Sequence, residues 1–127
     1  MSSPVVFDAG GLIALERGHR RMALIMATAL EEEGRLIVPA TVVAQVLRDA
    51  SRQVRLWRFL NHKATEIVPL NAAHAQGVGA LLRRSGTSDI ADAHVVLCAQ
   101  EEGSYSVVTS DPLDLRRLDR SLPLVEV

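Results

Sequence analysis

The sequence is poor in cysteine, aromatic residues and long apolar runs, and each shortage excludes a class of protein. Its single cysteine, Cys98, rules out an internal disulfide and fits a reducing compartment, so we expect a cytoplasmic protein. One Trp, one Tyr and two Phe are too few for an array that stacks single-stranded bases. No apolar run approaches the roughly 18 residues of a membrane span, and the apolar run at residues 5–7 is too short for a signal peptide. We therefore expect no membrane association.

Charge and length further limit the classes of protein to which the chain can belong. The net charge is only −1, so any binding of nucleic acid must come from local basic patches. With 127 residues, of which 48% are hydrophobic and 23% charged, the chain resembles an ordinary globular protein. We expect a single domain over residues 1–127.

Short apolar runs alternate with longer helical patterns along the chain. Strands are expected at 4–9, 35–38, 65–70, 105–110 and 122–127. Helices are expected at 10–34 (as one helix or as two divided near Gly18, with Gly34 as the stop), 39–62, 71–84, 86–100 and 111–119. This alternation predicts a three-layer α/β/α domain with a mainly parallel central sheet.

Four aspartates lie where such a sheet binds ligands, outside the carboxyl ends of its strands. Asp8 ends the first expected strand, and Asp111 closely follows the fourth. Asp89 and Asp92 begin a helix that is entered from a loop, in the segment GTSDIADAHVVLCAQ. If these strands are parallel neighbours, the four carboxylates converge at one edge of the sheet.

Each of these acids also has a structural interpretation. Asp8 and Asp111 could cap the helices that follow them, and Asp89 could interact favourably with a helix dipole. Asp92 lies beyond the usual capping positions and shares a helix face with Asp89. Two anions on one face repel each other, and a divalent cation is the simplest remedy. Oxygen ligands favour Mg²⁺ or Mn²⁺ over zinc.

Other carboxylate-rich or phosphate-binding folds do not match the pattern. Phosphatases that form an aspartyl phosphate need a second Asp two residues after the first, where this chain has Gly10. Response-regulator receivers need an Asp after the third strand and a Lys after a late strand. Val68–Leu70 contain no Asp, and the only lysine is Lys63. The segment GVGALLR lacks the spacing of a phosphate-binding loop.

Four segments, VVFDAGGLIAL, LIVPATVVAQVLRD, GTSDIADAHVVLCA and VVTSDPLDLRRL, resemble in order and spacing the signature segments of PIN-domain ribonucleases. The similarity is strongest to VapC-type toxins of toxin–antitoxin pairs. It implies a PIN fold and an endoribonuclease that uses Mg²⁺ or Mn²⁺ to cleave RNA, usually as a homodimer that a VapB-like antitoxin inhibits. Phosphodiester hydrolysis fits a carboxylate cluster, because a bound metal activates water and neutralises phosphate charge.

The resemblance assigns individual positions. It implies that Asp8, Asp92 and Asp111 are the catalytic, metal-binding acids, and that Thr109 or Ser110 is the hydroxyl residue preceding the last of them. Asp89 is a further candidate ligand, because it adds a carboxylate on the Asp92 face.

One position departs from the family pattern. The family usually has Glu where this chain has Gln45, so the site should carry one negative charge less and bind metal more weakly. Either Asp89, or Asp49 one helical turn beyond Gln45, could compensate. The alternative is a catalytically weakened PIN-fold module that acts through protein or RNA contacts.

Two further groups were considered. Arg48, Arg52 and Arg55, with Arg58, recur at intervals of three or four in one expected helix, either as a solvated face or as contacts to RNA or an antitoxin. The neighbouring Trp57 could belong to the core, to a dimer interface or to an antitoxin groove. His94 and Cys98 are four residues apart, but this helix is expected to be buried and we predict core packing there.

Overall fold

Five parallel strands form one central sheet in the computed structural model, which describes residues 4–103 and 106–127. The strand order is β3-β2-β1-β4-β5, and every neighbouring pair is parallel. The strands are β1 (Val5–Phe7), β2 (Leu36–Pro39), β3 (Thr65–Val68), β4 (Ser106–Thr109) and β5 (Leu124–Glu126). This confirms the mainly parallel sheet.

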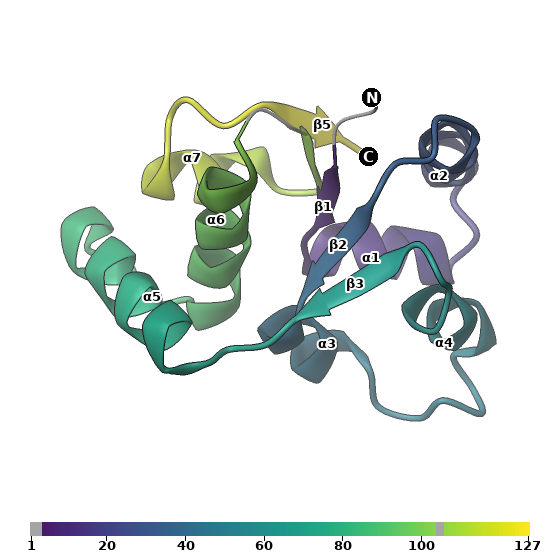
Figure 1. Ribbon diagram of the computed structural model, residues 1–127, viewed down its shortest axis with the longest axis horizontal. Coiled ribbons are helices and arrows are strands. Elements are labelled where there is room, and N and C mark those ends of the chain that lie inside the picture. The colour runs from purple at the N-terminus through teal and green to yellow at the C-terminus, as the bar shows by residue number, and fades with distance from the viewer. Residues whose placement is uncertain (1–3, 104–105) are drawn as a thin grey trace.

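Helices cover the sheet on both sides. They are α1 (Ala9–Glu16), α2 (Arg20–Glu31), α3 (Ala40–Val46), α4 (Val54–Leu60), α5 (Ala72–Ser85), α6 (Ile90–Glu102) and α7 (Pro112–Leu118). In Figure 1, α5 and α6 lie together to the left of the sheet, whereas α2 and α4 lie to its right and α1 passes behind it. The three-layer α/β/α architecture is thus confirmed. Among the described residues, no helix is long and apolar enough to cross a membrane.

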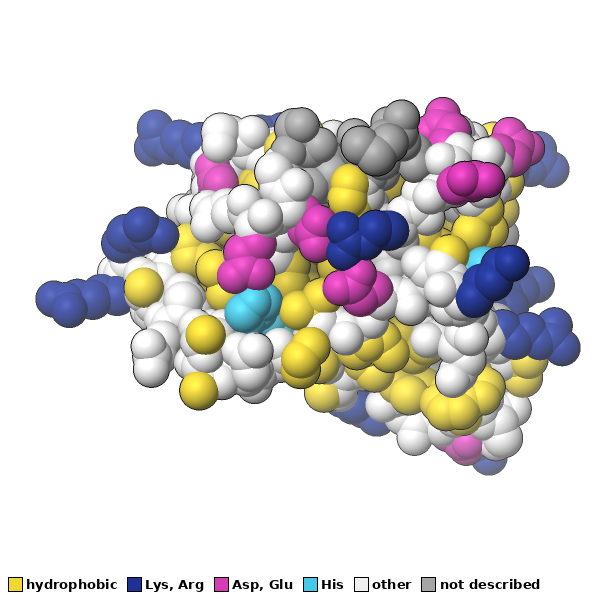
Figure 2. Space-filling model, in the orientation of Figure 1, with side chains coloured by type: hydrophobic (Ala, Val, Ile, Leu, Met, Phe, Trp, Pro, Cys, Tyr) yellow, Lys and Arg dark blue, Asp and Glu magenta, His cyan; other side chains and the backbone are white. Residues whose placement is uncertain are grey.

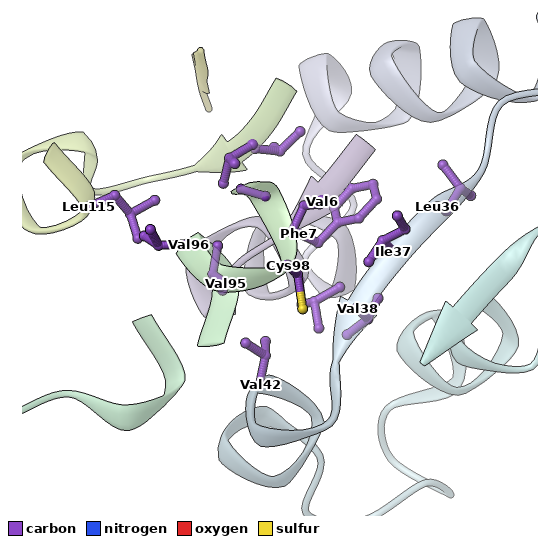
Figure 3. Packing of buried hydrophobic residues seen from close by; sticks show 14 of the residues in the cluster. Val6, Phe7, Leu36, Ile37, Val38, Val42, Val95, Val96, Cys98 and Leu115 are labelled. Carbon is purple, nitrogen blue, oxygen red and sulfur yellow. The ribbon is translucent and has the colours of Figure 1, made fainter. Parts of the chain in front are cut away.

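Strands β1 and β2 are apolar along their whole length because helices cover both of their faces. Val6 and Phe7 of β1, together with Ile37 of β2, are fully buried. Figure 3 shows these side chains packed with Val95 and Val96 of α6. Phe7 also meets the ring of Phe59 edge-on, with a centroid distance of 5.0 Å. The apolar core therefore holds the strand ends, and the polar residues after them, in fixed positions.

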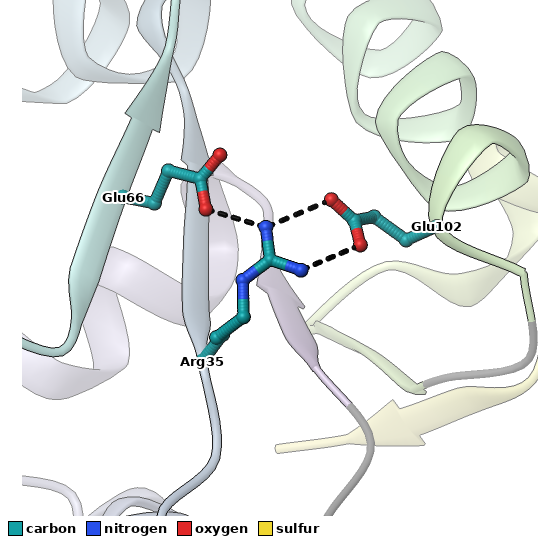
Figure 4. Close-up of polar contacts among 3 residues, drawn as sticks. All are labelled: Arg35, Glu66 and Glu102. Carbon is teal, nitrogen blue, oxygen red and sulfur yellow. Dashed lines mark hydrogen bonds and ion pairs between the residues drawn. The ribbon is translucent and has the colours of Figure 1, made fainter.

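An ion-pair network joins the last turn of α6 to the two strands at the opposite end of the sheet. Arg35 donates to Glu102 at 2.8 and 3.0 Å and to Glu66 at 2.5 Å (Figure 4). Arg35 and Glu66 are about half exposed and Glu102 about a quarter, so solvent screens the pairs and each contributes at most about 1 kcal/mol. The network orients α6 rather than carrying the stability of the fold.

The helix predicted at 39–62 is wrong, since the structure divides it into α3 and α4. The intervening loop is held by Gln53, whose Oε1 accepts from the backbone N–H groups of Arg48 and Asp49 at 2.8 and 2.9 Å. Its Nε2 donates to the Val46 carbonyl at 2.9 Å and so caps the end of α3. Residues 47–53 contain neither Gly nor Pro, so the local sign of a break there is limited to the turn residues Asp49 and Ser51.

The region 10–34 also forms two helices, the second of the two forms that we considered. Gly18 has φ +72°, a left-handed conformation that ends α1. At the end of α2 the left-handed residue is Glu33 (φ +57°), not Gly34 as expected. Gly34 still closes the helix, since its N–H donates to the Ala29 carbonyl at 2.7 Å.

Candidate functional site

Asp8 and Asp111 lie beside the point between β1 and β4 at which the strand order of the sheet reverses. The chain passes from β1 to β2 and β3 on one side, whereas β4 and β5 lie on the other. Phe7 pairs with Val108 in parallel register, so Asp8 and the residues after Val108 leave the sheet at the same edge. Such a reversal creates a crevice outside the carboxyl ends of the strands, where α/β proteins bind ligands.

Asp8 is buried at the start of α1, and its carboxylate has a structural role as well as a position in the crevice. It accepts the Gly11 N–H at 2.8 Å, so it is the N-cap of α1, as the structural interpretation proposed. Burial raises the pKa of Asp8, and the charge of Asp111 acts in the same direction. Hydrogen bonds from Thr109 and from the backbone of α1 oppose the rise. The Asp8 carboxylate therefore both caps α1 and experiences repulsion from the charge of Asp111.

Two glycines allow the β1–α1 turn to lie directly against the end of β4. A Cβ on Gly11 would lie 2.8 Å from the carbonyl oxygen of Val108, and one on Gly10 would lie 1.9 Å from Ser110 Oγ. Real Cβ atoms do not approach other atoms so closely. The glycines after Asp8 thus set the close approach that brings Asp8 beside the residues after β4, a reason that reading the sequence did not supply.

Thr109 and Asp111 form a small polar unit at the end of β4. The Thr109 side chain is fully buried, and its Oγ1 accepts the Asp111 N–H at 2.9 Å. The Thr109 side chain also acts on Asp8, whose pKa it lowers. Asp111 occupies the N-cap position of α7, but its side chain makes no capping hydrogen bond. Its exposed carboxylate therefore remains available to a ligand, and Thr109 links it to Asp8.

The other two aspartates lie at the start of α6, where they have different local roles. Asp89 is the N-cap and accepts the Asp92 N–H at 2.9 Å. Asp92 lies one turn further, and its own side chain makes no hydrogen bond among those of the described residues. The structural interpretation thus accounts for Asp89 and does not account for Asp92.

Asp92 is the residue on which the charges of the cluster act together. Burial first, then the charges of Asp89, Asp8, Asp114 and Asp111, raise its pKa to about 7. Asp114, in the first turn of α7, was not among the candidate residues, because its spacing after Asp111 suggested only a capping pattern. Its role in the field at Asp92 comes from the packing of α7 against α6, which no local pattern indicates.

A cleft opens beside Asp89, Asp92 and Asp114. It has a volume of about 230 Å³ and is lined by Thr87, Ser88, Asp89, Asp92, Asp114, Arg117 and Leu118. One of these, Arg117, lies 3.8 Å from the Asp114 carboxylate and is mostly exposed. The cleft therefore combines carboxylates with a single guanidinium at its rim, which suits a cation together with a phosphate.

Gln45 and Asp49, the residues at the position of altered charge, are separated by the helix break. Gln45 is exposed in the last turn of α3, a helix that packs against both α1 and α6. The expectation that Asp49 continues the Gln45 face is wrong, because α3 ends at Val46. The Asp49 carboxylate instead accepts the N–H and hydroxyl of Ser51 at 3.0 and 2.6 Å. Asp49 is thus engaged in its own loop.

The arginines do not form the single helical face that we expected. Arg48 and Arg52 lie in the loop between α3 and α4, where Arg48 donates to the Ala44 carbonyl at 2.6 Å and Arg52 lies 3.6 Å from Asp49. Arg55 belongs to α4 and reaches the Glu16 carbonyl at 3.4 Å. Arg48 and Arg52 therefore lie in the loop that Gln53 holds, apart from Arg55 in α4.

An apolar groove of about 470 Å³ lies between α2 and α4, and none of the candidate aspartates lines it. Its lining residues are Leu15, Gly18, His19, Met22, Ala23, Met26, Arg55, Arg58, Phe59 and His62. Trp57 is not among them and is 46% exposed on α4. Phe59 and Leu60 are buried in the core.

The donor chemistry of the acidic cluster fits a hard divalent cation. Its ligand atoms are carboxylate oxygens, which Mg²⁺ and Mn²⁺ prefer. Burial first, and then the charges of the neighbouring carboxylates, raise the pKa of Asp92, and a bound cation would relieve the repulsion between these charges. Within the described ranges, three atoms of possible ligands lie within 4.8 Å of one another only at a His and Cys group elsewhere. The aspartates would therefore have to draw together around a cation.

Comparisons with known proteins agree with this architecture. A model of the PIN domain matches residues 5–121. VapBC2 from Rickettsia felis, solved bound to a DNA fragment from their promoter, contains a chain similar to this one over 96% of this chain and 97% of its own, with 16% identity and a TM-score of 0.67. FitAB bound to the IR36 DNA fragment is similar over 96% and 94%, with 15% identity and a TM-score of 0.66. None of the curated proteins compared with the chain matches it.

Proposed function

The chain belongs to the PIN domain family, and from this premise we propose that it is a Mg²⁺- or Mn²⁺-dependent endoribonuclease, the toxin of a VapBC-like toxin–antitoxin pair. The observation that carries the proposal is the field at Asp92, where burial and four neighbouring carboxylates raise the pKa to about 7. Structural ion pairs would stabilise charge, whereas this arrangement opposes it. Such a cost is typical of a functional site.

We assign the carboxylates of Asp8, Asp92 and Asp111 to the cation, with Asp89 as an additional candidate. A bound divalent cation would neutralise charge on the scissile phosphate and activate water for hydrolysis. The chain's own contribution is to hold the acids. Asp8 is fixed by the Gly11 N–H and Thr109, and Asp111 is oriented through its backbone by Thr109. Arg117 at the cleft rim could contact a phosphate of the RNA.

A second candidate function rests on Gln45. An uncharged amide in the place of the usual Glu removes one negative charge, and Asp49 is not placed to restore it. A PIN fold with weak catalysis could act as a binding module through RNA or protein contacts. Asp89, which acts on Asp92, is the remaining acid that could compensate.

Calorimetric titration with Mn²⁺, together with cleavage of a mixed RNA with and without chelator, tests both candidates. For the endoribonuclease we expect metal-dependent cleavage that Asp92→Asn abolishes together with metal binding. The matched control is Glu31→Gln, which removes one charge from an exposed position near the opposite edge of the sheet and should change neither result.

Gln45→Glu separates an intact site from a weakened one. If the site is one charge short, this substitution should tighten Mn²⁺ binding about tenfold, since a charge at about 4 Å is worth roughly 4 kcal/mol at an effective dielectric of about 20, before desolvation and repulsion are subtracted. Unchanged affinity in Gln45→Glu, with a loss in Asp89→Asn, would mean that Asp89 fills the position. If Gln45→Glu, Asp89→Asn and Asp92→Asn all leave Mn²⁺ affinity unchanged, the binding module remains as the function.

For the antitoxin, the groove between α2 and α4 offers the best-suited surface. Its floor contains apolar side chains such as Met22 and Phe59, and Arg55 and Arg58 lie at its border. A segment with apolar residues followed by acidic ones complements this combination. Two of the predicted arginines, Arg48 and Arg52, remain candidates for RNA contact because both are exposed.

A further inference from the structure

A second set of metal ligands lies inside the fold, where α5 packs against α6. His94 and Cys98 are four residues apart on one face of α6, and His74 reaches them from α5. One ligand atom from each of the three lies within 4.8 Å of the others. We propose that His74, His94 and Cys98 bind a zinc-like transition-metal ion that joins α5 to α6.

The two imidazoles already have nearly the spacing that such an ion requires. His74 Nδ1 and His94 Nε2 are 2.9 Å apart, and the rings are almost perpendicular (89°). Two nitrogens that bind one zinc ion tetrahedrally at about 2.0 to 2.1 Å lie roughly 3.3 to 3.4 Å apart. An opening of a few tenths of an ångström would therefore admit the ion between them.

The far nitrogen of each ring has the partner that metal-bound histidines require. His94 Nδ1 lies 2.8 Å from Thr41 Oγ1, and His74 Nε2 lies 2.9 Å from a Glu101 carboxylate oxygen. Metal-bound histidines usually donate their other N–H to a carboxylate or a similar acceptor, which fixes the tautomer and the ring orientation. Both partners here can accept. The polar chain Thr41–His94–His74–Glu101 thus orients the two nitrogens toward each other.

Binding of a metal ion to His74, His94 and Cys98 would release one proton. Without metal, a single hydrogen lies between the two rings. When metal binds, neither nitrogen of the shared contact carries a hydrogen. His94 then has its hydrogen on Nδ1, from which it donates to Thr41. His74 has its hydrogen on Nε2, from which it donates to Glu101. An ordinary cysteine thiol is mostly protonated at neutral pH, and only the thiolate binds a metal, so the proton of Cys98 is the one released to solvent.

Ligand chemistry separates this site from the aspartate cluster. Imidazole and thiolate select zinc and similar ions, whereas carboxylates select Mg²⁺ or Mn²⁺. Cys98 lies in the apolar core near Val38 and Val95 (Figure 3), and His94 is fully buried. The His74 side chain is 11% exposed and its partner Glu101 is about half exposed, so this side of the group lies nearest to solvent. Figure 2 shows a histidine beside acidic side chains on the face where α5 and α6 lie together.

Titration of the full chain with Co²⁺, in the presence of excess Mg²⁺, tests the site. Cys98 is the only cysteine, so a thiolate-to-cobalt charge-transfer band can come only from this residue. We expect that band with the visible absorption of tetrahedral Co²⁺, displacement of Co²⁺ by Zn²⁺, and a higher melting temperature with Zn²⁺. Cys98→Ser should remove the charge-transfer band, and Glu101→Gln should weaken Co²⁺ binding about tenfold. His74→Gln should weaken it more than Glu101→Gln does.

Two controls keep the result specific. His62→Gln removes an exposed histidine outside the group, and Asp92→Asn alters the aspartate cluster, so both should leave the cobalt spectrum unchanged. Glu101 is exposed, so its variant tests the site even if a change in the core unfolds the protein. Absence of the band in the folded wild type, or equal affinity in wild type, His74→Gln and Glu101→Gln, would overturn the proposal and leave a hydrogen-bonded histidine pair.

Discussion

Asp92 is a single side chain whose charge opposes folding. Burial and the surrounding carboxylates raise its pKa from 3.8 to about 7. Between these two values the folded chain retains a proton that the unfolded chain releases. The free energy of unfolding therefore decreases as the pH rises from about 4 to about 7, and this contribution stays lost above pH 7.

We predict that Asp92→Asn stabilises the metal-free protein at pH 8 by about 1 to 2 kcal/mol, a figure reduced for solvent screening because the carboxylate is partly exposed. At pH 4 the advantage of the variant should be much smaller, since Asp92 is then protonated in the folded chain and about half protonated in the unfolded chain. Urea unfolding in chelator at both pH values measures the difference. His94, whose pKa burial lowers to about 4, is present in both proteins, so its own effect cancels.

Two results would contradict this account. Asp92→Asn could be less stable than wild type at pH 8, or the difference could be the same at pH 4 and pH 8. Addition of Mg²⁺ should reduce the advantage of the variant, because the cation stabilises only the wild-type carboxylates.

Among the elements, the turn from β1 into α1 places the site most directly. Asp8 caps α1 through the Gly11 N–H, and the Asp8 N–H donates to the Val108 carbonyl at 3.2 Å. The same carbonyl leaves no space for a Cβ on Gly11. One turn thus fixes the end of β1, the start of α1 and the distance to β4.

We predict that Gly11→Ala destabilises the protein by about 1 to 3 kcal/mol, because its methyl group would push α1 away from the backbone of β4. The shift should also weaken Mn²⁺ binding, since it moves Asp8. The matched control is Gly79→Ala on α5, where a Cβ meets nothing within 4 Å. That control should be neutral or stabilising by up to about 1 kcal/mol. Thermal unfolding of both variants measures this, and equal stability would refute the close contact.

Considered as a whole molecule, the protein has an exposed apolar pair on α4. Val54 and Trp57 are 47% and 46% exposed, and they are three residues apart on the helix. Exposed large apolar side chains of this kind often mark an interface. The expected homodimer remains a prediction, and this pair is its best-supported contact.

We predict that the wild type is a dimer in solution and that the double substitution Val54→Ser and Trp57→Ser gives a monomer, because it removes the apolar centre of the contact. Light scattering after size-exclusion chromatography measures the mass. Leu113→Ser on α7, where the side chain is 69% exposed, is the control and should remain dimeric. A monomeric wild type, or a dimeric double variant, would exclude this surface.

The sequence by itself determined the alternation of strands and helices and the placement of Asp8 and Asp111 after strands. Both depend on local patterns, namely apolar β-branched runs, helix caps and the residues that stop helices. The N-cap at Asn71, where the helix 71–84 was expected to begin, shows that such signals were reliable there. The four signature segments, taken in order, also pointed to the PIN family that the family model shows.

Only the tertiary structure decided the rest, because the deciding contacts join residues far apart in the chain. The loop between α3 and α4 is held by the Gln53 side chain, which donates to the Val46 carbonyl and also to the Glu16 carboxylate of α1, 37 residues away. Asp114 joins the field at Asp92 only through the packing of α7 against α6. His74 meets His94 across 20 residues of sequence, a contact that no spacing rule contains. Local chemistry sets each element, whereas packing of the buried faces selects which of their polar residues meet.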